Sequence, residues 1–171
     1  MMSSLFATAV SHDALGLAAP QVGSSMRAFV LRVPRAWTVV EARRLSPAAG
    51  ARRRARAGAG TPSHTAESFL GVLNPEILER STETAVGLEG CLSLPDAPEL
   101  VRRACEVRVR FTDSDTGALV ERDLSGLPAA VFQHELDHLD GVLVCDRAVP
   151  HKEEELDEAG HIFNIQLRTF Y

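Results

Sequence analysis

Residues 134–138 of this chain read His134-Glu135-Leu136-Asp137-His138. They lie in a segment, 128–140, that has the pattern of one helix, with a proline in its first turn and a glycine just past its end. On a helix, positions i and i+4 share a face, so the two imidazoles can bind one divalent cation, and Glu135 can reach a water on it. Because apolar residues share the stripe of the two histidines, we expect a metal site on the inward face of this helix.

A hydrolytic metal site needs a third protein ligand and an open position for water, and the sequence offers three sources. The pattern His-Glu-x-x-His-x-x-Gly-x-x-His matches through Gly141 but has Val144 at its last position, so it fails. A glutamate downstream of the helix is the second source, although the polar run 151–158 that contains these glutamates is typical of a solvated helical face. The third source is an upstream cysteine, and spacing does not choose among the three. The candidate residues are Glu153, Glu154, Glu155, Cys91, Cys105 and Cys145.

The periodicity of the rest of the chain predicts mainly strands. Apolar residues fit one face of a short helix at 5–10, and a loop rich in helix-breaking residues follows at 16–23. We interpret Cys105 as the start of a strand, Cys145 as a core residue and Pro95 as the end of an extended run. The predicted strands are 28–31, a short one near 77–78, 107–111, its hairpin partner 118–124, and 163–167. Many strands with one well-marked helix indicate an α+β domain.

Length and composition limit the classes of protein that the chain can belong to. Its 171 residues, 45% hydrophobic, suit a single domain, 1–171. No apolar stretch approaches a membrane span, and the net charge of −5 with 5% aromatics argues against direct nucleic-acid specificity. Residues 43–66 are rich in Arg and Ala, and we expect a flexible, exposed insertion there. Contact of this insertion with a polyanionic surface such as the ribosome is the functional alternative.

Three segments together resemble the motifs of the peptide deformylase family. They are Gly16-Leu17-Ala18-Ala19-Pro20-Gln21, Glu89-Gly90-Cys91-Leu92-Ser93 and Gln133-His134-Glu135-Leu136-Asp137-His138. The resemblance implies an α+β fold with mixed or antiparallel sheets around the central metal-binding helix. It also implies a catalytic domain that removes the N-formyl group from the N-terminal methionine of newly made peptides.

The same resemblance implies roles for individual residues. Cys91, His134 and His138 would be the metal ligands, with Fe²⁺ favoured and Zn²⁺, Ni²⁺ or Co²⁺ able to substitute. Glu135 would accept a proton from the metal's water and deliver it to the leaving amine. The oxyanion formed on the formyl group would be stabilised by the side chain of Gln21 and the backbone N–H of Leu92. The substrate cleft would be lined by small residues and their neighbours, namely Gly16, Leu17, Ala18 and Gly90.

The sequence departs from the family pattern at two positions. Family members usually carry Gly where this chain has Ala14, which would cost stability if that backbone required a positive φ, and many carry a substrate-rim Arg where it has Pro98.

The Arg-rich insertion and the Phe163-Asn164 tail resemble the mitochondrial branch, so we expect a mitochondrial protein, with the bacterial cytoplasm as the alternative. A monomer is expected. Two other functions stay open: a metallopeptidase with a downstream Glu ligand, and a non-catalytic deformylase-like protein that binds nascent chains or ribosomes.

Overall fold

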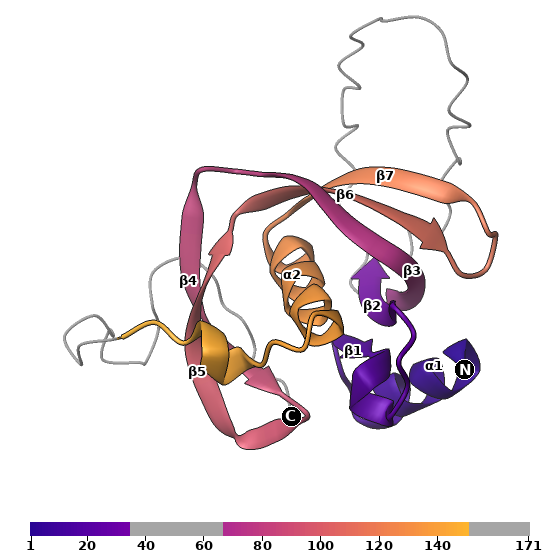
Figure 1. Ribbon diagram of the computed structural model, residues 1–171, viewed down its shortest axis with the longest axis horizontal. Coiled ribbons are helices and arrows are strands. Elements are labelled where there is room, and N and C mark those ends of the chain that lie inside the picture. Colours follow the sequence, from indigo (N-terminus) through magenta and orange to yellow (C-terminus); the bar gives the residue numbers. More distant parts are fainter. Residues whose placement is uncertain (35–66, 151–171) are drawn as a thin grey trace, which may run out of the picture.

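Helix α2 (Leu127–Leu139) lies between two antiparallel sheets in the computed structural model, which describes residues 1–34 and 67–150 (Figure 1). One sheet has five strands in the order β1-β2-β3-β6-β7, and the other is the hairpin β4-β5. This arrangement confirms the predicted α+β fold around a central helix. The remaining elements are α1 (Met2–Ser11), β1 (Gly16–Ala18), η1 (Ala19–Val22), β2 (Ala28–Pro34), β3 (Glu67–Arg80), β4 (Thr84–Cys91), β5 (Leu94–Ala104), β6 (Glu106–Asp113), β7 (Leu119–Ser125) and η3 (Val144–Arg147).

Helix α2 begins and ends close to the positions that the sequence predicts. Pro128 lies in its first turn, where the missing N–H costs no helical hydrogen bond. Beyond its end, Gly141 adopts the left-handed region with φ 75°, and the N–H of Val142 donates to the carbonyl of Asp137 at 2.9 Å. A glycine in the left-handed conformation just past the last turn is a common way for a helix to end. Among the described residues, neither helix has the length and hydrophobicity needed to cross a membrane.

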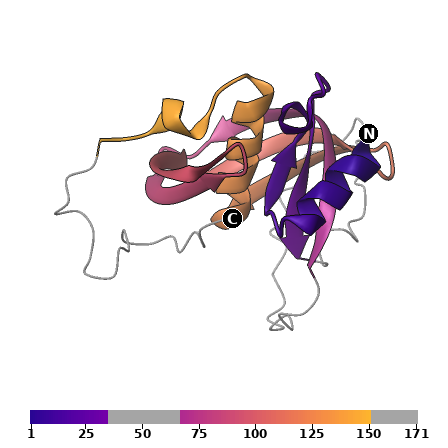
Figure 2. The same ribbon diagram turned by 90° about the horizontal axis from the view of Figure 1, so that it is seen from below.

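Strand β2 of the five-stranded sheet is buried between the two helices, which explains its unbroken apolar run (Figure 2). Phe29 and Leu31 point into the cluster that contains α2, whereas Ala28 and Val30 point into the cluster beneath α1. The Phe29 ring meets the Phe132 ring edge to face, with centroids 5.0 Å apart. A strand with apolar side chains on both faces loses the alternation typical of a half-exposed strand, and it gives α2 a rigid support.

The hairpin β4-β5 is the element that sequence periodicity did not reveal. Cys91 pairs with Leu94 and Glu89 pairs with Glu99, so residues 95–98 bulge out opposite Gly90. The bulge accommodates Pro95, which has no N–H to give to a ladder. The interpretation of Pro95 as a strand end is therefore wrong, because β5 continues through it to Ala104.

Several smaller expectations change or fall outside the described residues. Cys145 is exposed rather than part of the core, because the tight turn of η3 directs the adjacent Val144 inward instead. Cys105 was predicted to start a strand, but it lies between β5 and β6, one residue before β6 begins at Glu106. The predicted loop at 16–23 contains β1 and η1. Before the first motif it is Asp13 (φ 51°), not Ala14, that has a positive φ, so the alanine needs no strained backbone. The insertion at 43–66 and the strand at 163–167 lie outside the described residues.

Candidate metal centre and active site

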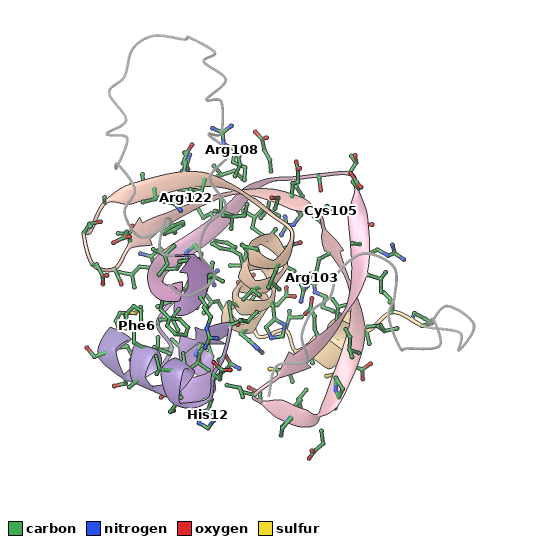
Figure 3. The ribbon with its side chains drawn as sticks, turned by 180° about the vertical axis from the view of Figure 1, so that it is seen from behind. Phe6, His12, Arg103, Cys105, Arg108 and Arg122 are labelled. Carbon is green, nitrogen blue, oxygen red and sulfur yellow. The ribbon has the colours of Figure 1, made fainter. Side chains whose placement is uncertain are left out.

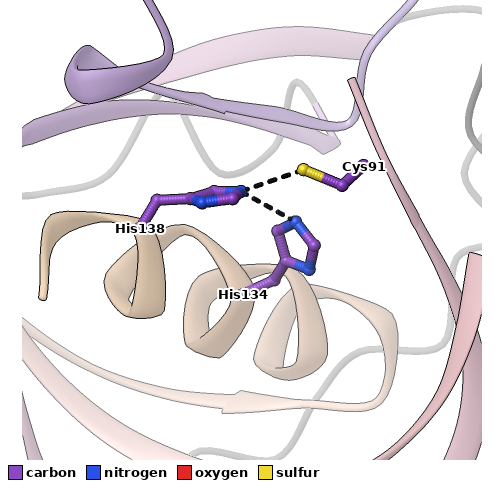
Figure 4. A group of neighbouring side chains, drawn as sticks. All are labelled: Cys91, His134 and His138. Carbon is purple, nitrogen blue, oxygen red and sulfur yellow. Dashed lines mark hydrogen bonds between the residues drawn. The ribbon is translucent and has the colours of Figure 1, made fainter. Parts of the chain in front are cut away.

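The three residues that the family resemblance singles out as ligands lie together (Figure 4). Cys91 is the last residue of β4, and His134 and His138 lie one turn apart on α2. The Nε2 atom of His138 is 3.2 Å from Cys91 Sγ and 3.2 Å from His134 Nε2. All three candidate ligand atoms lie within 4.8 Å of one another. A thiolate and two imidazoles are a donor set suited to one divalent transition metal.

Glu89 orients the first histidine. Its carboxylate accepts a hydrogen bond from His134 Nδ1 at 2.8 Å, which orients the ring so that Nε2 faces Cys91 and His138. Burial opposes ionisation of Glu89, but hydrogen bonds from Arg103 and His134 outweigh it and lower the carboxyl pKa to about 2. Burial lowers the pKa of His134, but its hydrogen bonds with Cys91 and Glu89 outweigh this effect and raise that pKa to about 10.

A buried arginine joins the hairpin to the helix. Arg103, on β5, donates from Nε and from one terminal nitrogen to the two oxygens of Glu89 at 2.8 and 2.9 Å. Its other terminal nitrogen donates to Asp137 on α2, which also accepts from Arg147 at 2.8 Å. Figure 3 shows Arg103 directed from β5 toward the central helix. Glu89, Arg103 and Asp137 therefore hold the two ligand-bearing elements together, and sequence reasoning assigned none of them a role.

Cys91 is held as a thiolate. Burial raises the pKa of a thiol, but hydrogen bonds from His134, His138 and the backbone N–H of Ser93 overcome this and lower the Cys91 pKa to about 5. Its side chain packs with Val101 and Val144 in a small apolar cluster beneath η3. Cys91 is thus an anion at neutral pH, which is the form that binds metal. The two other cysteines, which spacing alone could not separate from Cys91, lie elsewhere.

Glu135 is buried beside the ligands with one oxygen unsatisfied. Its Oε2 is the only buried side-chain N or O atom without a hydrogen-bond partner among the described residues. Burial raises its pKa to about 7, with further contributions from the anions of Cys91 and Glu89 and an opposing effect of the two histidines. An orphaned carboxylate oxygen requires a ligand or water partner. The donor set and this oxygen together fit a metal ion with a water on it.

A cavity opens over these residues, and about 40 Å³ of it is accessible to the centre of a water molecule. Gly16 and Gly90 lie on opposite walls, and a Cβ on Gly16 would stand 2.3 Å from Glu135 Oε1, so only glycine leaves room for the carboxylate. Leu17 and Ala18, also predicted to line the cleft, are buried in the two cores beneath it. The cavity is lined by Ala14, Leu15, Gly16, Gln21, Glu89, Gly90, Cys91, Leu92, Ala130, Val131, His134 and Glu135.

Gln21 enters the cavity from η1 with its amide oriented by two contacts. Its Oε1 accepts the backbone N–H of Ala18 at 2.8 Å, which places Nε2 toward the hairpin. That nitrogen donates to Ser93 Oγ at 3.1 Å and lies 3.6 Å from Cys91 Sγ. The side chain therefore presents a donor next to the candidate metal ligands, as the motif predicted.

This combination of fold and site defines a metal-dependent hydrolase. The family model described as polypeptide deformylase matches residues 1–154. Peptide deformylase of Thermotoga neapolitana is 41% identical over 145 residues, which cover 85% of this chain and 68% of that protein. A Bradyrhizobium peptide deformylase is 37% identical over 146 residues, covering 85% of this chain and 70% of the relative.

Solved structures give the same assignment. The crystal structure of Thermotoga maritima peptide deformylase superposes with a TM-score of 0.64 at 35% identity, covering 86% of this chain and 78% of that one. A Met-Ala-Ser-bound class I type b peptide deformylase from Acinetobacter baumannii has a TM-score of 0.64 at 32% identity, with 85% and 77% of the two chains covered. The chain belongs to the peptide deformylase family. It is an enzyme that removes the N-formyl group from newly made peptides.

Proposed function

We propose that Glu135 is the general base and acid of this deformylase. Its raised pKa, about 7, allows it to accept a proton from the attacking water and to return that proton to the leaving amine of the peptide. The buried Oε2 atom without a partner is the observation that supports this role best. Gly16 allows the carboxylate to stay in place by leaving the space beside Oε1 empty.

Two donors are proposed to stabilise the oxyanion that forms on the formyl group. They are Gln21 Nε2 and the backbone N–H of Leu92, and both residues line the cavity. Because they belong to different elements, η1 and the β4-β5 turn, the formyl oxygen would be held between the two walls. Preorganised donors of this kind act most strongly on charge that develops in the transition state.

Cys91, His134 and His138 are proposed to hold one divalent metal ion, with Fe²⁺ favoured and Zn²⁺, Ni²⁺ or Co²⁺ able to substitute. A bound divalent ion supplies Lewis acidity, which makes hydroxide available near neutral pH. The Cys91 thiolate and the orientation of His134 by Glu89 support this assignment. Cys91→Ala should therefore abolish metal retention in equilibrium dialysis. If the variant retains metal, the ligand lies instead among Glu153, Glu154 and Glu155, outside the described residues.

The cleft between the segments 14–16 and 90–92 is proposed to take the N-formylmethionyl peptide. Gly16 and Gly90 allow a peptide backbone to approach closely on both sides, whereas Leu17 and Ala18 would contribute only through their backbone. The experiment that tests the function is deformylation of a formyl-methionyl tripeptide by Fe²⁺-loaded protein under anaerobic conditions, with Glu135→Gln as the control. Absence of turnover with a full metal complement would favour the non-catalytic binding protein.

The proposals on domain organisation, cellular context and assembly rest on sequence. We propose a single catalytic domain, 1–171, that is a monomer, with residues 43–66 as an exposed insertion and contact of this insertion with the ribosome as the alternative. Mitochondrial targeting rests on the same insertion and on the tail at 163–164, while the bacterial origin of the relatives named above favours the bacterial cytoplasm. Light scattering would test the monomeric state. Co-sedimentation with ribosomes would test the docking, and fractionation of cells would test the compartment.

A further inference from the structure

We propose that Ser93 is a positioning residue that fixes the amide of Gln21 for catalysis. Gln21 lines the cavity from η1, and Ser93 lies in the turn between β4 and β5, next to the lining residue Leu92. Gln21 Nε2 donates to Ser93 Oγ at 3.1 Å, and this bond bridges the cleft beside Cys91. The inference rests on the proposed role of Gln21 as an oxyanion donor.

Ser93 gives the Gln21 amide a second hydrogen bond in addition to the one from Ala18. The Ala18 N–H can only donate, so the Gln21 atom 2.8 Å from it is the oxygen and the nitrogen faces the hairpin. One contact leaves the amide plane free to pivot about its oxygen. The bond to Ser93 Oγ is a second point of attachment, and it directs one of the two amide hydrogens. The other hydrogen points to Cys91 Sγ at the longer distance of 3.6 Å, and a substrate oxygen, which is the stronger acceptor, would replace the sulfur.

The second acceptor of Gln21 explains why this orientation matters. Gln21 Nε2 also donates to Cys91 Sγ, at the longer distance of 3.6 Å. Without the Ser93 hydroxyl, the sulfur would be the acceptor left to this nitrogen among the described residues, and the amide could turn fully toward it and away from the substrate oxygen. Ser93 also supports the sulfur directly, but through its backbone N–H, which a side-chain substitution does not remove. The two contributions of the residue can therefore be separated.

Ser93→Ala tests the proposal. Because the side chain is exposed, its removal leaves no buried group unpaired and should not change the melting temperature or the metal content. We expect kcat on a formyl-methionyl tripeptide to fall about three- to tenfold, the effect of one lost hydrogen bond, with KM changed less than twofold. Ser93→Thr, which keeps the hydroxyl, should recover most of the loss. Ser24→Ala is the matched control, because its hydroxyl contacts the Met26 N–H and not Gln21.

A double-mutant cycle with Gln21→Leu separates positioning from a structural role. If Ser93 acts through Gln21, Ser93→Ala should have no further effect on kcat once Gln21 is leucine. An equal loss in both backgrounds, or a fall in metal content, would overturn the proposal, as would an unchanged kcat in Ser93→Ala alone. Wild-type kcat in Gln21→Leu would instead overturn the oxyanion role of Gln21, and the positioning role of Ser93 with it.

Discussion

Replacement of Arg103 by methionine should destabilise the metal-free protein by about 3–5 kcal/mol, the usual cost of removing one partner from a buried ion pair. The Arg103 side chain is 8% exposed, and it faces Glu89 and Asp137, which are 5% and 13% exposed. Methionine fills similar volume but leaves both carboxylates without this cation. Asp137 retains Arg147, at 2.8 Å, so most of the loss should arise from Glu89.

The loss should depend on pH with a definite sign. Glu89 has its pKa lowered from 4.5 to about 2 in the folded protein, which corresponds to about 3 kcal/mol of stability. A lowered carboxyl pKa contributes fully above pH 4.5 and is lost as the pH falls toward 2. Arg103→Met removes the part of this contribution that Arg103 supplies, while the bond from His134 remains, so the gap in stability between wild type and variant should be widest above pH 5. It should shrink as the pH falls below 4.5.

Urea unfolding in the presence of a chelator, at pH 4 and pH 7, measures both effects. Arg102→Met is the matched control, because Arg102 is exposed on the same strand and makes a 3.4 Å hydrogen bond to Thr84 Oγ1. It should change stability by less than about 0.5 kcal/mol. Adding Glu89→Gln to Arg103→Met should recover part of the loss by removing the orphaned charge. Equal unfolding midpoints for the two arginine variants, or a gap that does not vary with pH, would refute the reasoning.

Other substitutions test the chemistry. Glu135→Gln should retain its metal by elemental analysis yet lose at least about 10²–10⁴-fold in kcat, the usual worth of general acid–base catalysis. Gly16→Ala should lower kcat more than tenfold, because the added Cβ would displace Glu135 Oε1. Gly71→Ala is the control: its Cβ crowds Ser114 Oγ, far from the site, so it should lower the melting temperature and leave kcat unchanged. Gln21→Leu should reduce kcat by roughly 10²–10³-fold with little change in KM. Gln21→Glu should reduce kcat further, because its carboxylate repels the oxyanion. Equal kcat in wild type and Gln21→Leu would contradict the role of Gln21 as an oxyanion donor.

The features that sequence predicted are those that depend on local periodicity or on a short motif. Helix α2 has a proline near its start, a glycine past its end and histidines one turn apart, and each signal lies within the helix or next to it. The strand at 107–111 was recognisable because Val107, Val109 and Phe111 alternate with arginines. The cluster of Cys91 with the histidines was predicted only through the resemblance of three motifs to a family. Spacing alone could not choose Cys91, since its distance from α2 is fixed by tertiary structure.

The features that escaped prediction depend on contacts between distant segments. The β5 strand was concealed because its bulge carries Pro95 and Pro98, residues that normally argue against a strand. Arg103 looked like one arginine of an adjacent pair, and only the fold shows that Arg102 faces solvent while Arg103 is buried. Glu89 lay within a recognised motif, yet its bond to His134 spans 45 positions and has no local signature.

The position of the metal ligands follows from these non-local polar contacts more than from sheet pairing. In the described part of the chain, the hairpin that carries Cys91 shares no strand pairing with the five-stranded sheet. The tip of the hairpin makes few apolar contacts, since Cys91 and Leu94 pack in a small cluster and Leu92 packs against the cluster beneath α1, so hydrophobic contact alone would leave its angle to α2 poorly defined. Directional bonds supply that definition: Arg103 links Glu89 to Asp137, and Gln133 donates to the Ala104 carbonyl at 3.1 Å while accepting from its N–H at 3.2 Å. Such bonds would fix the distances that metal coordination by the candidate ligands demands, and on that proposal the buried polar residues around the site contribute to its function.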